Sequence, residues 1–123
     1  MKTGNVVQER SFAFAVRIVN LYKYLYDEKK EFVLSKQVLR SGTSIGANVE
    51  EGLGGQSDKD FISKLNIAYK ETRETIYWIK LLWKTDFLSQ EQIDSILHDA
   101  DELCKIIAQI LLTMKNKIKL PNS

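Results

Sequence analysis

Seven side chains at helical spacing are the part of this sequence that could form a charged site. Four of them follow one another at about one turn of helix, and three more lie further along the chain. The set consists of Arg40, Ser44, Asn48, Glu51, Glu71, Glu74 and Trp78. Arginine and glutamate on neighbouring helices can form a planar, charge-assisted ion pair, and serine and asparagine can satisfy the remaining polar groups. We expect this cluster to set helix register and assembly, because such pairs specify partners more reliably than they stabilise a fold.

A stripe of basic side chains is the second candidate site. Its members are Lys59, Lys70, Arg73, Lys80 and Lys84. They fall within roughly 80° of one another on a helical projection, and only Lys70 and Glu74 are well spaced for an ion pair within the helix. Repeated around an oligomer, this basic stripe could hold the phosphate backbone of RNA or DNA. Nothing beside it resembles a set of stacking aromatic residues, so we expect sequence-tolerant binding. A solvated helix face is the alternative, because the formal net charge is only +2.

The residues that most often perform catalysis or bind metals are scarce. His98 is the single histidine, so the paired Glu-x-x-His motifs of di-metal four-helix bundles are missing. Cys104 falls on an apolar helix stripe, with no nearby base in the sequence to activate its thiol. The glycine-rich stretch over residues 42–55 lacks the Gly-Lys-Ser/Thr ending of a phosphate-binding loop. These observations predict a protein that is not an enzyme and that uses no metal or cofactor.

Four amphipathic helices are predicted to position these side chains. Their expected ranges are about 7–28, 36–53, 58–85 and 90–116, within a single domain over residues 1–123. The sole proline stands at position 121, so the body of the chain is free to be helical. Helices joined by short connections pack as antiparallel neighbours. The fold class is therefore predicted to be all-α, as an antiparallel up-down-up-down four-helix bundle.

Local capping signals set the expected helix boundaries. Ser35 is placed to cap the second helix, and Gly54 and Gly55 are expected to end it in the left-handed conformation. Two further signals are the pairs Ser57 with Asp60 and Ser89 with Gln92. Both pairs match a capping box, which predicts the starts of the third and fourth helices. The fourth helix is expected to fade into a frayed basic tail from residue 115 onwards.

The apolar residues exceed what one small bundle core needs. In the first helix, a core-facing stripe is flanked by a second apolar stripe. The core-facing stripe is Phe14, Ile18, Leu21 and Leu25, and the flanking stripe is Phe12, Ala15, Val19, Tyr22 and Tyr26. In the third helix, Ile67, Trp78 and Leu82 fall outside the predicted core stripe. Because exposed apolar clusters tend to mark contacts, we expect a closed cyclic oligomer.

Two glycines lie one turn apart inside the predicted second helix, at Gly42 and Gly46. Each costs about 1 kcal/mol against alanine in a helix interior, so a compensating interaction is expected. We predict that another helix packs almost against the backbone at these two positions, because glycine has no side chain to hold it away.

Three stretches of the sequence match a known family. QVLRSGTSIGANVEE begins at Gln37, DFISKL begins at Asp60 and KETRETIYW begins at Lys70. With these motifs the chain resembles, from Phe12 to about Met114, the bacterial four-helix bundle family of 23S rRNA intervening sequence proteins. The resemblance implies an antiparallel bundle that assembles as a ring, as a homopentamer. It also implies kinship with the accessory protein of diversity-generating retroelements, a basic pentamer that engages nucleic acid and a reverse transcriptase.

Two functions agree with these observations. One is a ring-forming protein that binds RNA or DNA through the basic stripe, and the other is an oligomeric adaptor that binds another protein. The resemblance implies strongly basic retroelement relatives, whereas a net charge of +2 per subunit is weak, which argues against very tight nucleic-acid binding and leaves both functions open. A cytoplasmic protein without a membrane segment is expected, because no signal sequence is visible and no apolar run approaches about 18 residues.

Overall fold

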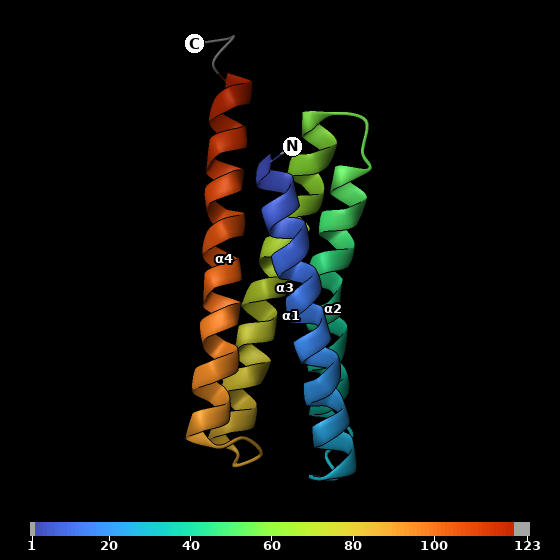
Figure 1. The fold of residues 1–123 in the computed structure, drawn as a ribbon, viewed down its shortest axis with the longest axis vertical. Coiled ribbons are helices and arrows are strands. Elements are labelled where there is room, and N and C mark those ends of the chain that lie inside the picture. Colours follow the sequence, from blue (N-terminus) through green and yellow to red (C-terminus); the bar gives the residue numbers. More distant parts are fainter. Residues whose placement is uncertain (1, 120–123) are drawn as a thin grey trace.

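Four α-helices and the short connections between them form residues 2–119, the part of the chain described by this computed structural model (Figure 1). They are α1 (Lys2–Asp27), α2 (Leu34–Leu53), α3 (Asp58–Lys84) and α4 (Gln90–Lys119). Each helix packs against the helices before and after it in the chain, and α4 also packs against α1. Consecutive helices run in opposite directions (Figure 1). The predicted all-α, up-down-up-down four-helix bundle is confirmed.

The first and last helices are longer than predicted. α1 begins at Lys2 instead of near residue 7, and α4 continues to Lys119 instead of ending near residue 116. No proline precedes position 121, so the backbone hydrogen bonds of α4 meet no breaker in its last turns. α4 therefore extends past the other three helices (Figure 1). The last residues of the predicted frayed tail, 120–123, lie outside the described residues.

The start of α2 differs from the prediction in its capping residue. α2 begins at Leu34, so Ser35 lies inside the helix instead of before it. The Glu31 carboxylate accepts hydrogen bonds from the backbone N–H groups of Val33 and Ser35, at 3.1 and 2.7 Å. A negative group at a helix N-terminus satisfies free N–H donors and complements the helix dipole. This role explains why the charged side chain of Glu31 is buried.

The end of α2 also contradicts the prediction. No glycine among the described residues has a positive φ, so Gly54 and Gly55 do not supply a left-handed turn. Gly54 has a φ of −83°, and its N–H donates to the carbonyl of Glu50 at 3.1 Å. Close approach explains Gly55 instead, because a Cβ there would lie 2.9 Å from the Cβ of Asp60.

Both predicted capping boxes form, one of them with a variation. The Asp60 N–H donates to the Ser57 hydroxyl at 3.1 Å, while the Asp60 carboxylate accepts from the N–H of Gln56 at 3.1 Å. Ser89 and Gln92 bond reciprocally, since the Gln92 N–H donates to the Ser89 hydroxyl at 3.2 Å and the Ser89 N–H donates to Gln92 Oε1 at 2.8 Å. These local bonds start α3 and α4 where the sequence predicts.

The core runs through all four helices. The predicted core-facing stripe of α1 is buried, with Ile18 and Leu25 fully enclosed. In α3 the placement of Leu82 outside the core is wrong, because Leu82 is fully buried, as is Thr75. α3 packs against both α2 and α4, so its buried face is wider than a stripe that meets one neighbour. No helix within residues 2–119 has an apolar stretch long enough to cross a membrane.

The two interior glycines bring α2 against α1, as predicted. A Cβ at Gly42 would lie 2.7 Å from Ile18 Cγ1, and a Cβ at Gly46 would lie 3.3 Å from the carbonyl oxygen of Ser11. Any side chain at these positions would press on α1, so close packing offsets the low helix propensity of glycine.

Candidate functional site

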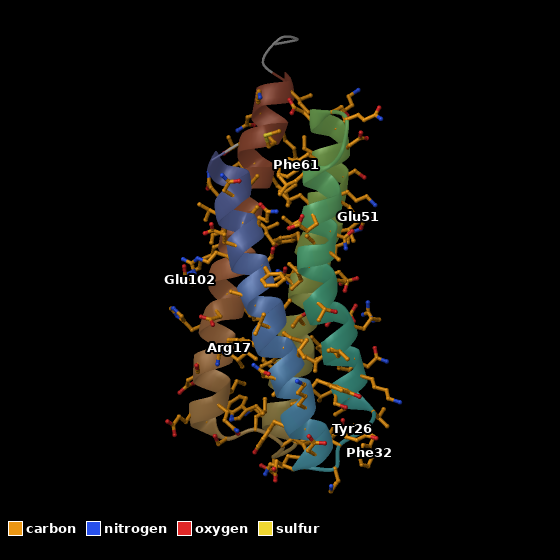
Figure 2. The ribbon with its side chains drawn as sticks, turned by 45° about the vertical axis from the view of Figure 1, so that its right-hand side comes forward. Arg17, Tyr26, Phe32, Glu51, Phe61 and Glu102 are labelled. Atoms are coloured by element: carbon orange, nitrogen blue, oxygen red, sulfur yellow. The ribbon has the colours of Figure 1, made fainter. Side chains whose placement is uncertain are left out.

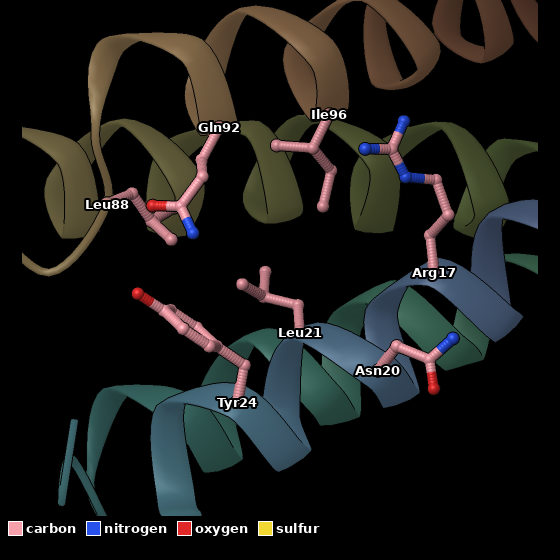
Figure 3. Close-up of a pocket in the computed structure, with 7 residues that line it drawn as sticks. All are labelled: Arg17, Asn20, Leu21, Tyr24, Leu88, Gln92 and Ile96. Atoms are coloured by element: carbon pink, nitrogen blue, oxygen red, sulfur yellow. The ribbon is translucent and has the colours of Figure 1, made fainter. Parts of the chain in front are cut away.

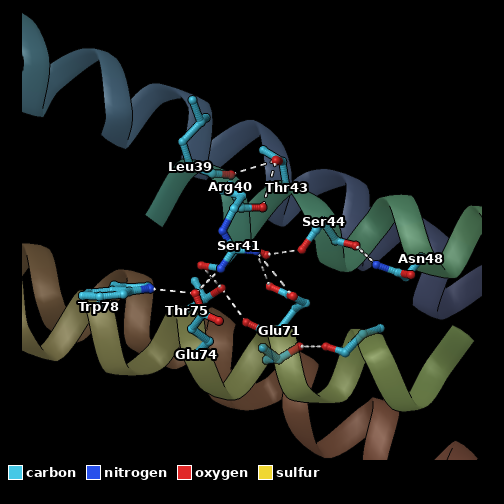
Figure 4. Close-up of polar contacts among 12 residues, drawn as sticks. Leu39, Arg40, Ser41, Thr43, Ser44, Asn48, Glu71, Glu74, Thr75 and Trp78 are labelled. Carbon is cyan, nitrogen blue, oxygen red and sulfur yellow. Dashed lines mark hydrogen bonds and ion pairs between the residues drawn. The ribbon is translucent and has the colours of Figure 1, made fainter. Parts of the chain in front are cut away.

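Arg40 joins α2 to α3 through two carboxylates (Figure 4). Its guanidinium lies 3.3 Å from Glu71 and pairs with Glu74 through the other terminal nitrogen. Glu74 also accepts a hydrogen bond from the indole N–H of Trp78 at 2.9 Å. Four of the seven predicted cluster residues therefore meet in one network across the α2–α3 interface.

This network changes the acidity of its members. The hydrogen bond from Trp78 lowers the pKa of Glu74, and the pair with Arg40 lowers it further. The hydrogen bond to Glu74 in turn raises the pKa of Arg40. The side chain of Arg40 is 51% exposed and that of Glu74 is 37% exposed, so water screens their attraction. We expect the pair to contribute about 1 kcal/mol or less, which makes it more useful for helix register than for stability.

The other three predicted cluster residues lie apart from the Arg40 network. The Ser44 hydroxyl donates to the carbonyl of Ser41 at 3.0 Å, and the Asn48 amide donates to the carbonyl of Ser44 at 2.8 Å. Both side chains therefore bond within α2. Glu51 pairs with Lys64 of α3 at 3.6 Å, nearer to the α2–α3 connection. A helical projection places these residues on one face but does not show which partners reach them.

The structure contains a buried polar contact between α2 and α3 that the sequence analysis did not predict. The Thr75 hydroxyl is hydrogen-bonded to the Ser41 hydroxyl at 2.9 Å. Both residues are fully buried. Buried hydroxyls need partners, so this contact adds orientation to an otherwise apolar interface. The signal in the sequence is a small polar residue at a core-facing position of each helix.

The basic stripe, defined by the five α3 side chains named above, is exposed along its whole length. Within the described chain, none of the five cations has a carboxylate oxygen within 4.0 Å. Three acids of α3 are paired with other helices. Glu71 and Glu74 pair with Arg40, so Glu74 is not paired with Lys70, and Asp58 pairs with Lys117 of α4 at 3.6 Å. The positive charge of the basic stripe is therefore left largely uncompensated on its own helix.

Aromatic rings lie in and beside the basic stripe, which corrects the expectation that it has none. Tyr77 is 58% exposed and falls inside the angular range of the stripe. Arg73 lies 6.0 Å from the ring centre of Tyr69, and Lys84 lies 4.2 Å from that of Trp83. The helical projection that defines the stripe could have placed Tyr77 in it, because this residue follows Arg73 by about one turn.

A small pocket lies between α1 and α4 (Figure 3). Its volume of about 290 Å³ is at the lower limit of ligand pockets, which usually hold about 300–1,000 Å³. Its lining is Arg17, Asn20, Leu21, Tyr24, Leu88, Gln92 and Ile96. Arg17 pairs with Asp99 at 2.7 Å, so its charge is already compensated. No Asp, Glu, His or Cys lines the pocket, and Tyr24 is the one lining residue of a type that enzymes use as a general acid or base.

The histidine and the cysteine considered in the sequence both lie on α4. His98 is exposed on α4. Cys104 is half-buried, and burial raises the pKa of its thiol, which disfavours the reactive thiolate. Among residues 2–119, no three His, Cys, Asp or Glu side chains are grouped so that they could hold a metal ion.

Large apolar side chains are exposed on α1 and at the turn into α2. Phe12 is 68% exposed and Val33 is 71% exposed. The rings of Tyr26 and Phe32 meet at a centroid distance of 4.7 Å at one end of the bundle (Figure 2). The flanking stripe predicted for α1 is therefore open to solvent at both of its ends.

These features define an antiparallel four-helix bundle protein with a basic face on α3 and exposed apolar residues on α1. The sequence profile of the 23S rRNA-intervening sequence protein family matches residues 4–109. The chain belongs to this family, as the motifs in α2 and α3 predict.

A solved structure supports the same assignment. It is the crystal structure of a protein with unknown function from the S23 ribosomal protein family of Bacteroides thetaiotaomicron VPI-5482. The two chains are 56% identical with a TM-score of 0.87, and the match covers 89% of this chain and 97% of that one. No curated protein sequence matches this chain. The family and the fold are thereby established, and a molecular function has to be inferred from the surfaces.

Proposed function

We propose that the protein is a cytoplasmic, non-enzymatic homo-oligomer that forms a ring and binds RNA or DNA through the basic stripe of α3. The ring expected from the family resemblance is a pentamer. In a ring of five subunits the stripe would present about 25 cations, although each subunit is nearly neutral.

The observation behind this proposal is the uncompensated charge of the basic stripe. Arg40 draws Glu74 toward α2, and Lys117 pairs with Asp58, so these carboxylates do not neutralise the α3 lysines. Phosphate binding needs cations that are accessible and unpaired. Such cations replace the counterions that surround the nucleic acid, and the release of these counterions supplies much of the affinity. The exposed side chains of the basic stripe meet this requirement.

Reversing two charges tests the nucleic-acid function. Arg73→Glu combined with Lys80→Glu should abolish binding to RNA in an anisotropy assay while leaving the oligomer mass unchanged. Lys23→Glu combined with Lys36→Glu is the matched control, because both side chains are exposed on other helices and the net charge changes equally. Equal loss in both double variants would indicate a nonspecific charge effect and contradict a site on α3.

Salt dependence provides a second test of the same site. If one strand contacts about five phosphate-binding side chains, affinity should fall by about 100-fold between 50 and 200 mM salt. A flat salt response would contradict a phosphate-backbone interface.

The oligomer is tested separately, because the exposed apolar residues of α1 support it. An exposed phenylalanine such as Phe12 keeps its apolar surface in contact with water, which is unfavourable unless another surface covers it. Light scattering at micromolar concentration should return a multiple of the monomer mass, and Phe12→Ser should lower it. A monomer would contradict the ring, and a dimer would contradict a pentamer.

A second candidate function is an oligomeric adaptor for another protein. The observation that favours it is the pair of exposed apolar residues at the turn between α1 and α2, Phe32 and Val33. If this turn binds a protein partner, Val33→Ser should weaken partner capture without changing the oligomer mass or RNA binding. RNA binding that is undetectable even at low salt would make the adaptor the better proposal.

A further inference from the structure

Tyr77 is placed differently from the other aromatic side chains of α3. It lies among the members of the basic stripe, with Arg73 about one turn before it and Lys80 about one turn after it. It is 58% exposed, whereas Tyr69 and Trp83 are half-buried. The side chains of Arg73 and Lys84 already lie close to the rings of Tyr69 and Trp83. The Tyr77 ring is thus the most accessible aromatic surface in the stripe.

The ring of Tyr77 is supported by its neighbour in the sequence. The rings of Tyr77 and Trp78 meet at a centroid distance of 5.0 Å and an interplanar angle of 71°, so they do not stack face to face. Trp78 is itself held by its hydrogen bond to Glu74, which pairs with Arg40. These contacts lie on one side of the Tyr77 ring, while 58% of the residue remains exposed to a ligand.

We propose that Tyr77 stacks on an unpaired base, so that the basic stripe takes single-stranded nucleic acid in preference to duplex. This inference rests on the proposed function and specifies its substrate class. Lysine and arginine attract any phosphate backbone, but an aromatic ring gains affinity only from a base whose face is accessible. In a duplex the bases are stacked on one another, and freeing one requires unpairing and unstacking.

The expected effect follows from the strength of base stacking. A base–aromatic stack corresponds to roughly a 5- to 150-fold difference in affinity on substitution by alanine. Tyr77 is a single ring on a helix surface, so we expect a value near the lower end, about tenfold. Stacking uses the face of the base and reads neither its edges nor the sugar, so single-stranded RNA and DNA should bind alike.

The test compares two substitutions of Tyr77 on three probes. The probes are a single-stranded RNA of about 12 nucleotides, a DNA strand of the same sequence and the corresponding DNA duplex. Tyr77→Ala should weaken binding of both single strands by about tenfold and leave duplex affinity unchanged, whereas Tyr77→Phe should bind all three as wild type does. Leu112→Ala is the control, because Leu112 is a similarly exposed large side chain, at 56%, but lies on α4 and outside the basic stripe. Tryptophan fluorescence should change on binding single strands, because Trp78 contacts Tyr77.

The outcomes separate this inference from the function on which it rests. If Tyr77→Ala binds single strands as wild type does, while the Arg73 and Lys80 charge reversal abolishes binding, the stacking inference is wrong and the basic stripe remains the site. Equal affinity of wild type for single strand and duplex would also overturn the inference. Absence of binding to all three probes at low salt would overturn the proposed function as well.

Discussion

Gly42→Ala is the substitution that most directly tests how closely α1 and α2 pack. Alanine is a better helix former than glycine by about 1 kcal/mol, so propensity alone predicts a more stable protein. The added Cβ would, however, lie 2.7 Å from both Cγ1 and Cγ2 of Ile18. Ile18 is fully buried and branched at Cβ, so it has few alternative rotamers to adopt.

The net effect is a loss of stability. Overpacking a core costs about 1–3 kcal/mol, and the upper end applies here because two carbons of a constrained side chain are in conflict. After the gain in propensity of about 1 kcal/mol is subtracted, the expected loss is about 2 kcal/mol. For a domain of this size that corresponds to a fall of about 8 °C in Tm. Gly54→Ala is the control, because its φ of −83° suits alanine and its nearest neighbours would be 3.6 Å away.

Thermal and urea unfolding at equal protein concentration measure both variants, since an oligomer has a concentration-dependent Tm. Gly54→Ala should equal wild type or gain up to about 1 kcal/mol. In an Ile18→Ala background both carbons at 2.7 Å are gone and only the Ile18 Cβ, at 3.1 Å, remains close, so Gly42→Ala should lose most of its penalty. If the single substitution Gly42→Ala raised the Tm, this result would refute the close approach of α1 to α2.

Substitutions at three further positions test the helix cap and the Arg40 network. Glu31→Ala should cost about 0.5–2 kcal/mol in urea unfolding, because the N–H groups of Val33 and Ser35 lose their acceptor, whereas Glu31→Gln should lose less. Arg40→Ala should cost about 1 kcal/mol or less, since the pair is half exposed, and a loss above about 3 kcal/mol would show that it is buried by an oligomer contact. The pKa of Glu74 is lowered in the fold, so its stabilising effect is present above the unfolded pKa of about 4.3 and is lost as pH falls through the folded value. Wild type should therefore lose more stability than Glu74→Gln between pH 6 and about pH 3, and parallel pH curves would contradict this assignment.

The sequence was sufficient for features that depend on short stretches of chain. The capping box of Ser89 and Gln92 needs only residues three apart, and the core-facing stripe of α1 needs only helical periodicity. Gly42 and Gly46 indicated a close helix contact because their propensity cost requires one. The motifs around Arg40 and Glu71 were long enough to identify the family, and the short connections indicated the antiparallel arrangement of the helices.

Two of the failures arose because the role of a residue depended on partners that its own helix pattern does not show. Leu82 looks peripheral on α3 alone but is buried because α3 packs against two helices. Ser35 looks like an N-cap, but α2 already begins at Leu34, and the Glu31 carboxylate accepts from the N–H groups of Val33 and Ser35 instead. Local patterns rank the possible roles of a residue, but competing partners select one of them.

For the candidate site, the sequence determined which charges exist and along which helix face they recur. It could not determine which of them are compensated, because an ion pair depends on distances across helices that periodicity does not contain. Only the tertiary structure decided that Glu74 pairs with Arg40 and not with Lys70. It also decided that Trp78 donates a hydrogen bond to Glu74, whereas Tyr77 stays exposed among the cations. The basic stripe is thus a property of the sequence, and its uncompensated charge is a property of the packed bundle.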